Sequence, residues 1–90
     1  MASRPIERRV RVAATSGLHA RPAALFSEAA AALGVPVSVT NAAGTTVDAA
    51  SILGILTLGV AHGEAVTLRS ESAGAVETLA AMLERDLDDE

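Results

Sequence analysis

Proline at position 22 fixes where one helix of this chain can begin. Proline is accepted within the first turn of an α-helix but not further along, because its ring has no N–H and clashes with the preceding turn. Apolar residues then recur at helical spacing as far as Leu33, and Gly34 followed by Pro36 predicts the end. The helix therefore starts within about three residues before Pro22, which places His19 at or beside its N-cap.

Strands are predicted in four segments, and all but the short third one show the period of two that is typical of strands with one buried and one wet face. They are residues 6–13, 35–40, 45–47 and 65–69. In the first segment Ile6, Val10 and Val12 are expected on the buried face. The turn-forming sequence at 41–44 predicts a hairpin between the second and third segments. One-sided alternation favours an antiparallel sheet.

Two further helices complete the expected order of elements. Asp48 or Ser51 is expected to cap a short helix that ends before Gly59, although Gly54 inside it costs about 1 kcal/mol relative to alanine. The last helix is predicted from an apolar face. That face consists of Val76, Leu79, Ala80, Leu83 and Leu87. The order is βαββαβα, which predicts an α+β fold: a two-layer open-faced sandwich with a four-stranded antiparallel sheet covered on one face by three helices.

Size and composition exclude several classes of protein. The chain has 90 residues, enough for a single domain over 1–90, and its only aromatic residue is Phe26. It has no cysteine, which excludes a disulfide scaffold, and its two histidines alone do not predict a metal site. No apolar run reaches the roughly 20 residues that span a bilayer, and the N-terminus is charged. We expect no membrane insertion and a cytoplasmic location.

The net charge of -4 is concentrated at the C-terminal end. The acids there are Asp86, Asp88, Asp89 and Glu90. Four of the seven arginines lie in the first eleven residues, but Glu7 interrupts them and no aromatic side chain accompanies them. A nucleic-acid partner is therefore not expected.

The segment before Pro22 carries the residues with chemical potential. Backbone N–H groups at a helix N-terminus stabilise a nearby anion by about 0.3 to 1 kcal/mol, and Arg21 adds a guanidinium that binds phosphate oxygens with two donors. The same partial positive charge disfavours protonation of His19, which leaves a neutral nucleophile for in-line attack on a phosphoryl group. The alternative is that His19 only ends a helix at the surface and that Arg21 is solvated.

The segment Gly17-Leu-His19-Ala-Arg21-Pro22-Ala-Ala resembles the active-site segment of HPr, the family of histidine-containing phosphocarrier proteins of the sugar phosphotransferase system. Residues 51–59 resemble the second signature of that family. The resemblance implies that His19 takes a phosphoryl group on its δ1 nitrogen from enzyme I, itself charged by phosphoenolpyruvate, and passes it to sugar-specific IIA domains. It implies that Arg21 assists the transfer and that the N–H groups of Ala20 and Arg21 bind phosphate oxygens.

The resemblance also implies that the protein is a carrier and not a conventional enzyme. A protein of this family is a stoichiometric carrier with a phosphohistidine intermediate, an enzyme only in a loose sense, and it uses no cofactor. We expect a monomer. The hydroxyls of Thr15 and Ser16 could assist with the phosphoryl oxygens, or both could be ordinary loop residues. His62 lies in a turn without a motif around it and is expected at the surface.

A second candidate site is an apolar docking patch for the partner proteins. Its residues are Ala24, Ile52, Leu53 and Leu56. Aliphatic residues at helical spacing are more often core, so we expect a split in which Ile52 and Ile55 face the sheet while Leu53 and Leu56 face outwards, or the reverse.

Ser51 matches the position that a kinase phosphorylates in some members of the family, but it is also a suitable helix cap. Ala50, Glu28 and Ala31 stand where the family often has basic residues. We therefore favour the cap and expect partner surfaces that are less acidic than usual.

Two other functions compete with phosphoryl transfer. Compact α+β domains also serve as regulatory modules that bind small ligands, and such a module would not need a nucleophilic His19. RNA binding on the sheet would need stacking aromatics and a basic surface, which this chain lacks.

Overall fold

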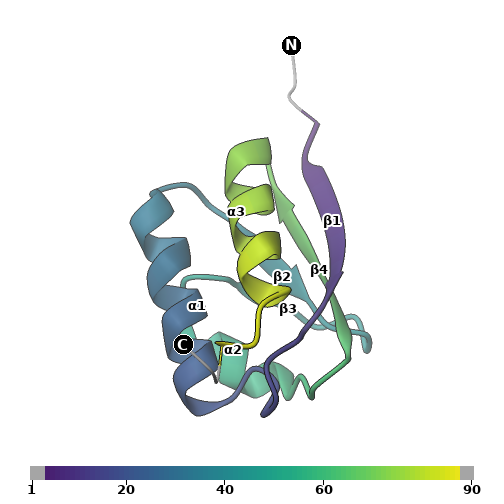
Figure 1. Ribbon diagram of the computed structural model, residues 1–90. Helices are drawn as coiled ribbons and strands as arrows, with labels where there is room; N and C mark the ends of the chain where they lie inside the picture. Colours follow the sequence, from purple (N-terminus) through teal and green to yellow (C-terminus); the bar gives the residue numbers. More distant parts are fainter. Residues whose placement is uncertain (1–3, 88–90) are drawn as a thin grey trace.

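The computed structural model describes residues 4–87, over which three helices cover one face of a four-stranded antiparallel sheet (Figure 1). The strands are β1 (Ile6–Arg11), β2 (Ser38–Thr40), β3 (Thr46–Asp48) and β4 (Ala65–Ser70). The helices are α1 (Ala20–Leu33), α2 (Ile52–Leu58) and α3 (Ala73–Leu83). The predicted βαββαβα sandwich is confirmed. Asp88, Asp89 and Glu90 of the acidic C-terminal end lie outside the described residues.

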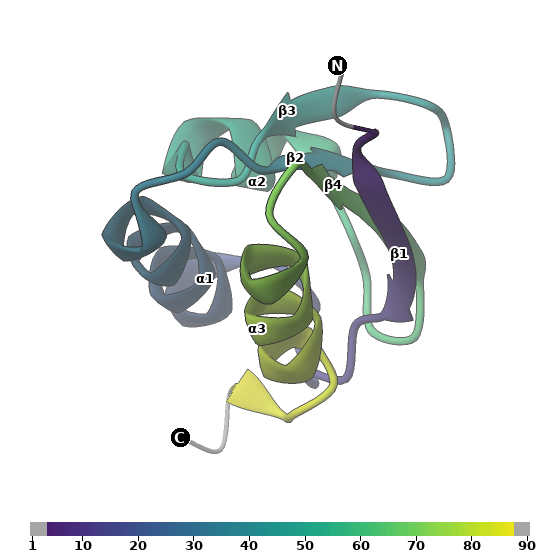
Figure 2. The same ribbon diagram turned by 90° about the horizontal axis from the view of Figure 1, so that it is seen from above.

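The sheet has the order β1-β4-β2-β3, so β4, the last strand in the chain, lies between β1 and β2. Val10 of β1 lies opposite Val66 of β4, and Leu68 of β4 lies opposite Val39 of β2. These four side chains are buried on the face that the helices cover. Figure 2 shows α1 and α3 together on that side of the sheet.

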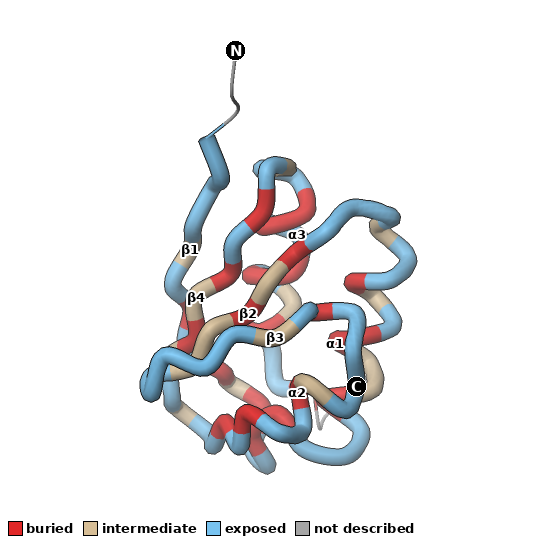
Figure 3. Tube along the Cα trace, turned by 180° about the vertical axis from the view of Figure 1, so that it is seen from behind, coloured by how far each residue is buried: buried red, intermediate tan, exposed pale blue. Residues whose placement is uncertain are grey.

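The core fills the space between the two layers. Its largest fully buried side chains include Phe26 of α1, Ile55 of α2 and Leu79 of α3. In Figure 3 the loop of the β2–β3 hairpin is exposed, whereas buried positions recur along β4 and α3. None of the helices in the described part of the chain is long and apolar enough to cross a membrane.

The first strand differs from the predicted pattern at both ends. Ile6 was expected to be buried but is 40% exposed, because it stands at the outer end of an edge strand. The strand ends at Arg11 and not at residue 13, because the chain leaves the sheet there and the Ala13 N–H donates to the Leu83 carbonyl at 2.9 Å. Arg8, on the helix-facing side, forms ion pairs with Glu77 of α3 and with Glu84, the C-cap residue of that helix.

Two other elements are shorter than predicted. β2 begins at Ser38, since Pro36 has no N–H for the ladder and its carbonyl instead accepts a hydrogen bond from the Ser70 hydroxyl at 2.7 Å. α3 ends at Leu83, so Leu87 is not on the helix face as predicted. Leu87 is nevertheless buried, with 1% exposure, because the chain turns back onto the core.

Candidate functional site

His19 is the N-cap residue of α1, as the position of Pro22 predicts. Its backbone is extended (φ -122°, ψ 159°) and its side chain is exposed and makes no capping hydrogen bond. Pro22 is the third residue of the helix and is buried. The imidazole therefore stands beside the first N–H groups of α1, which have no partner within the helix.

The first residue after His19 has an unusual backbone conformation. Ala20 has a φ of 46°, in the left-handed region that residues with a Cβ rarely occupy. Such a conformation costs about 1–2 kcal/mol and persists only where the surrounding structure enforces it. Leu18 and Pro22, on either side, are both buried and fix the path of the chain.

The loop before His19 is pressed against the segment that precedes β4. The Leu18 N–H donates to the Val60 carbonyl at 2.9 Å, and the Leu18 side chain is fully buried. Gly17 has a φ of 72°, and a Cβ at this position would lie 2.2 Å from the same carbonyl oxygen. Only glycine fits here, which explains its place in the motif.

The turn after Val60 contacts the same loop. The Gly63 N–H donates to the Val12 carbonyl at 2.8 Å, and Nδ1 of His62 lies 3.2 Å from the Ala14 carbonyl oxygen. His62 is exposed, as predicted, but its ring is bound to the loop that leads to His19. Sequence reasoning missed this contact, because no local pattern links two residues so far apart along the chain.

Thr15 is held by a residue from the other end of the chain. Its N–H donates to Oδ1 of Asp86 at 3.2 Å, and its hydroxyl donates to Oδ2 of Asp86 at 2.8 Å. The hydroxyl has only one proton, so in this arrangement it does not donate to a phosphoryl oxygen. The sequence offered the hydroxyls of both Thr15 and Ser16 and favoured Ser16. The structure gives the Thr15 hydroxyl a structural role, and Ser16 lies exposed in the same turn.

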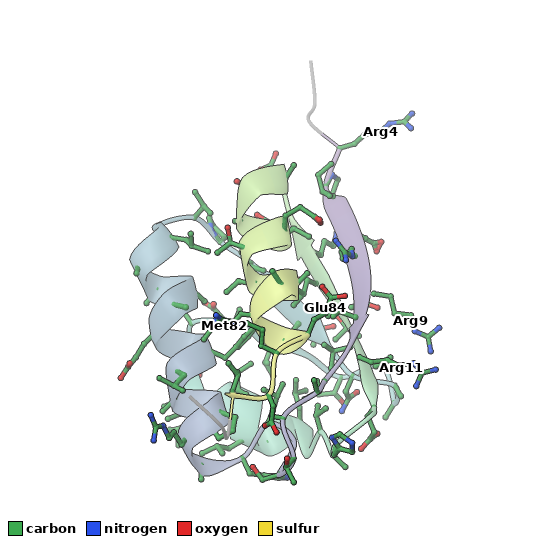
Figure 4. The ribbon with its side chains drawn as sticks, in the orientation of Figure 1. Arg4, Arg9, Arg11, Met82 and Glu84 are labelled. Atoms are coloured by element: carbon green, nitrogen blue, oxygen red, sulfur yellow. The ribbon has the colours of Figure 1, made fainter. Side chains whose placement is uncertain are left out.

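Arg21 follows in the first turn of α1 and is exposed. The arginines near the N-terminus lie elsewhere. Figure 4 shows Arg9 and Arg11 pointing away from β1, on the side of the molecule opposite α1. Arg21 is thus the arginine that α1 itself places near His19, two residues further along the chain.

The predicted docking residues divide differently from either sequence alternative. Ile55 faces the core, but Ile52, Leu53 and Leu56 are 41%, 74% and 37% exposed. Ile52 is on the same side of the helix as Ile55, but it is the first helical residue and its side chain remains accessible. α2 packs against α1 beside its N-terminal half, where Ala24 is partly buried (Figure 1).

Ser51 is the N-cap of α2, and its hydroxyl oxygen accepts a hydrogen bond from the Gly54 N–H at 3.1 Å. Asp48, the other predicted cap, instead accepts from the Ala50 N–H at 2.8 Å in the turn before the helix. α2 contains no charged residue, and Arg21 and Glu28 are the charged residues of α1.

Cavities and metal-ligand clusters do not add residues to this site. A cavity of about 940 Å³ lies between β2, β3 and the end of β4, lined by residues such as Pro36, Val47 and Arg69. None of the predicted site residues lines it. Among residues 4–87 no group of three or more His, Asp or Glu side chains could hold a metal ion.

Comparison with known proteins gives a consistent result. The family model described as "PTS HPr component phosphorylation site" matches residues 6–85. Phosphocarrier protein HPr of Streptomyces coelicolor is 46% identical over 86 residues, which cover 92% of this chain and 92% of that protein. The crystal structure of HPr from Bacillus anthracis has a TM-score of 0.82 and 36% identity, with 88% of this chain and 96% of that one covered. HPr from Thermoanaerobacter tengcongensis has a TM-score of 0.85 and 34% identity, with 94% and 98% covered.

Proposed function

The chain belongs to the HPr family of phosphocarrier proteins of the phosphotransferase system, and from that premise we propose that His19 accepts a phosphoryl group from enzyme I and passes it to sugar-specific IIA domains. The observation that carries this proposal is the position of His19. An exposed imidazole at the N-cap of α1 is open to a protein donor and stands beside the first N–H groups of the helix, which have no partner within the helix itself.

The transfer is an in-line displacement at phosphorus. A bond forms between Nδ1 of His19 and phosphorus while the bond between phosphorus and the donor breaks, and the reverse sequence delivers the group to the acceptor. His19 acts as the nucleophile in the first transfer and as the leaving group in the second. The chain is therefore a carrier that is regenerated in each cycle, an enzyme only in a loose sense.

The charge that arrives with the phosphoryl group is met by groups that are already in place. The N–H groups of Ala20 and Arg21, in the first turn of α1, are donors for its oxygens, and the Arg21 guanidinium can supply two more. A helix N-terminus stabilises an anion by about 0.3–1 kcal/mol. Such modest stabilisation suits a carrier, because a tightly held phosphoryl group would not be passed on.

We assign partner docking to the exposed apolar surface beside this site. It consists of the exposed Ile52, Leu53 and Leu56 and the partly buried Ala24. Leu53 is the most exposed large apolar side chain of the described residues, and exposed apolar surface of this kind favours protein–protein contact. Because α2 is uncharged and α1 carries Glu28 where basic residues are frequent in the family, we expect this docking to depend little on charge.

For Ser51 we favour a structural role, since its hydroxyl already caps α2. We further propose that the carrier works in the cytoplasm as a monomer, because a single docking surface can serve donor and acceptors in turn. Its partners under this proposal are proteins, and no cofactor takes part.

The direct test is intact-mass measurement after incubation with enzyme I and phosphoenolpyruvate. We expect the mass of one phosphoryl group to be added, to be lost in acid and to survive in base. His19→Ala should abolish the modification, whereas His62→Ala, which removes the other histidine, should keep it. Arg21→Ala should slow both transfers without unfolding the protein. Equal modification of His19→Ala and the unaltered protein would overturn the assignment.

A further inference from the structure

We propose that Asp86 is a positioning residue for phosphoryl transfer: its carboxylate holds Thr15 and thereby fixes the loop that places His19 at the N-terminus of α1. The inference rests on the proposed function of His19. It adds to that function a residue that lies 67 positions away from His19 in the chain, in the segment after α3.

The Asp86 carboxylate forms two hydrogen bonds with one residue, Thr15. Oδ1 of Asp86 accepts from the Thr15 backbone N–H at 3.2 Å, and Oδ2 accepts from the Thr15 hydroxyl at 2.8 Å. Hydrogen bonds to a charged acceptor are stronger than those between neutral groups, and two of them fix both the position and the orientation of Thr15.

Asp86 can act as a fixed point because its own segment is anchored. The next residue, Leu87, is 1% exposed and belongs to the core. Two residues before Thr15, the Ala13 N–H donates to the carbonyl of Leu83, the last residue of α3, at 2.9 Å. The carboxylate therefore acts from a chain segment that is packed and hydrogen-bonded to the same loop, and it is not a free surface group.

The effect passes from Thr15 to His19 through a short, constrained path. Thr15 occupies the turn closed by the Gly17 N–H, which donates to the Ala14 carbonyl at 2.9 Å. Gly17 is pressed against Val60, and Leu18 is fully buried and bound to the same carbonyl. Gly17 and Leu18 confine the backbone between this turn and His19, so a shift at Thr15 is passed along the chain towards His19.

The left-handed conformation of Ala20 makes the site sensitive to such a shift. This residue keeps an unfavourable φ of 46° only because its neighbours enforce it. Loosening the loop on the N-terminal side lets Ala20 relax towards the ordinary helical region. The direction of its N–H and the position of the His19 ring would change together.

The experiment uses the full chain and phosphoramidate, a small phosphoryl donor that does not need the docking surface. His19 attacks phosphorus, the P–N bond of phosphoramidate breaks and ammonia leaves. We expect Asp86→Ala and Thr15→Val each to lower the rate about tenfold, since small displacements of a reacting group have effects of this size or larger. Thr15→Ser, which keeps the hydroxyl, should restore most of the rate. Glu71→Ala, which removes a carboxylate just before α3, is the matched control and should react normally.

Two further measurements separate positioning from a loss of stability. The double variant Asp86→Ala/Thr15→Val should react no more slowly than Asp86→Ala alone, because Asp86→Ala removes both hydrogen bonds and Thr15→Val removes only the one from the hydroxyl. In ¹H–¹⁵N spectra the Ala20 amide signal should move in Asp86→Ala and remain in place in Glu71→Ala. If Asp86→Ala does not fold, Thr15→Val decides the question by the same rate and the same amide signal.

The outcomes of the inference and of the proposed function are distinct. If the unaltered protein is not phosphorylated on His19, the function itself is refuted. If it is phosphorylated and Asp86→Ala reacts at the same rate with an unshifted Ala20 signal, the positioning role is overturned. Additive effects in the double variant would also overturn it, since Asp86 would then not act through Thr15.

Discussion

Replacing Gly17 by alanine tests the close contact on which the loop before His19 depends. The residue has a φ of 72°, and the added Cβ would lie 2.2 Å from the Val60 carbonyl oxygen and 2.8 Å from the Ala61 Cα. Both are backbone atoms, so no side-chain rotation can relieve the overlap. The loop must move away from Val60, and the hydrogen bond from Leu18 to the Val60 carbonyl is lost or lengthened.

The expected loss of stability in Gly17→Ala has two parts, and the same substitution at a second glycine separates them. Gly34, the C-cap of α1, has a similar φ of 70°, but a Cβ there would meet nothing within 4 Å. Gly34→Ala therefore measures the left-handed conformation alone, about 1–2 kcal/mol. Gly17→Ala adds the cost of forcing a group into a packed region, about 1–3 kcal/mol, for a total of about 2–5 kcal/mol.

Thermal and urea unfolding followed by circular dichroism measure both variants. In a domain of this size 1 kcal/mol corresponds to a shift in Tm of about 4–8 °C. Gly34→Ala should therefore lower the Tm by about 4–16 °C. Gly17→Ala should lower it clearly further, and should also slow phosphorylation of His19, which Gly34→Ala should leave unchanged. Equal destabilisation by the two substitutions would refute the argument from the Val60 contact.

Three other predictions concern α2 and the docking surface. Ser51→Ala removes the hydroxyl that caps α2 and should lower the free energy of unfolding by about 1 kcal/mol in denaturant titrations, while Ser51→Asp, which keeps a capping oxygen, should not. Ile55→Ala, at a fully buried position, should cost about 2–5 kcal/mol, whereas Leu53→Ser, at a position 74% exposed, should leave the Tm nearly unchanged and weaken binding to enzyme I in calorimetry. Because α2 is uncharged, the rate of phosphoryl transfer from enzyme I should fall less than about threefold between 50 and 200 mM salt, a range in which strongly charge-steered association slows steeply.

The fold could be predicted because its signals are local. Pro22 and Gly34 fix the two ends of α1, and alternation in β4 is followed residue by residue in the structure. His19 could be placed at the N-cap for the same reason, since it stands three positions before a proline that must lie in the first turn. Local signals do not show which side chains at the end of an element are left uncovered by the rest of the fold. Ile6 and Ile52 have apolar side chains at buried-face positions, yet each stands at the end of its element and remains exposed.

The supports of the site could not be predicted from the sequence. Asp86 is 71 residues from Thr15, and a carboxylate in a charged C-terminal run shows no pattern that distinguishes it from its neighbours. The contact of His62 with Ala14 is equally remote. Hydrogen bonds of this kind depend on how two loops meet, and neither hydrophobic periodicity nor capping preference carries that information.

The site therefore depends on the whole fold, although its motif is short. The loop that ends at His19 is held by Val60 on the approach to β4, by the turn at His62 and by Asp86 after α3, and all three holds require the helices to be packed on the sheet. A peptide with the motif alone would lack them and could not keep Ala20 in its left-handed conformation, because nothing would offset its cost of about 1–2 kcal/mol. The imidazole and Arg21 supply the chemistry, but the arrangement in which a phosphoryl group meets open N–H donors is produced by contacts between residues that are far apart in the chain.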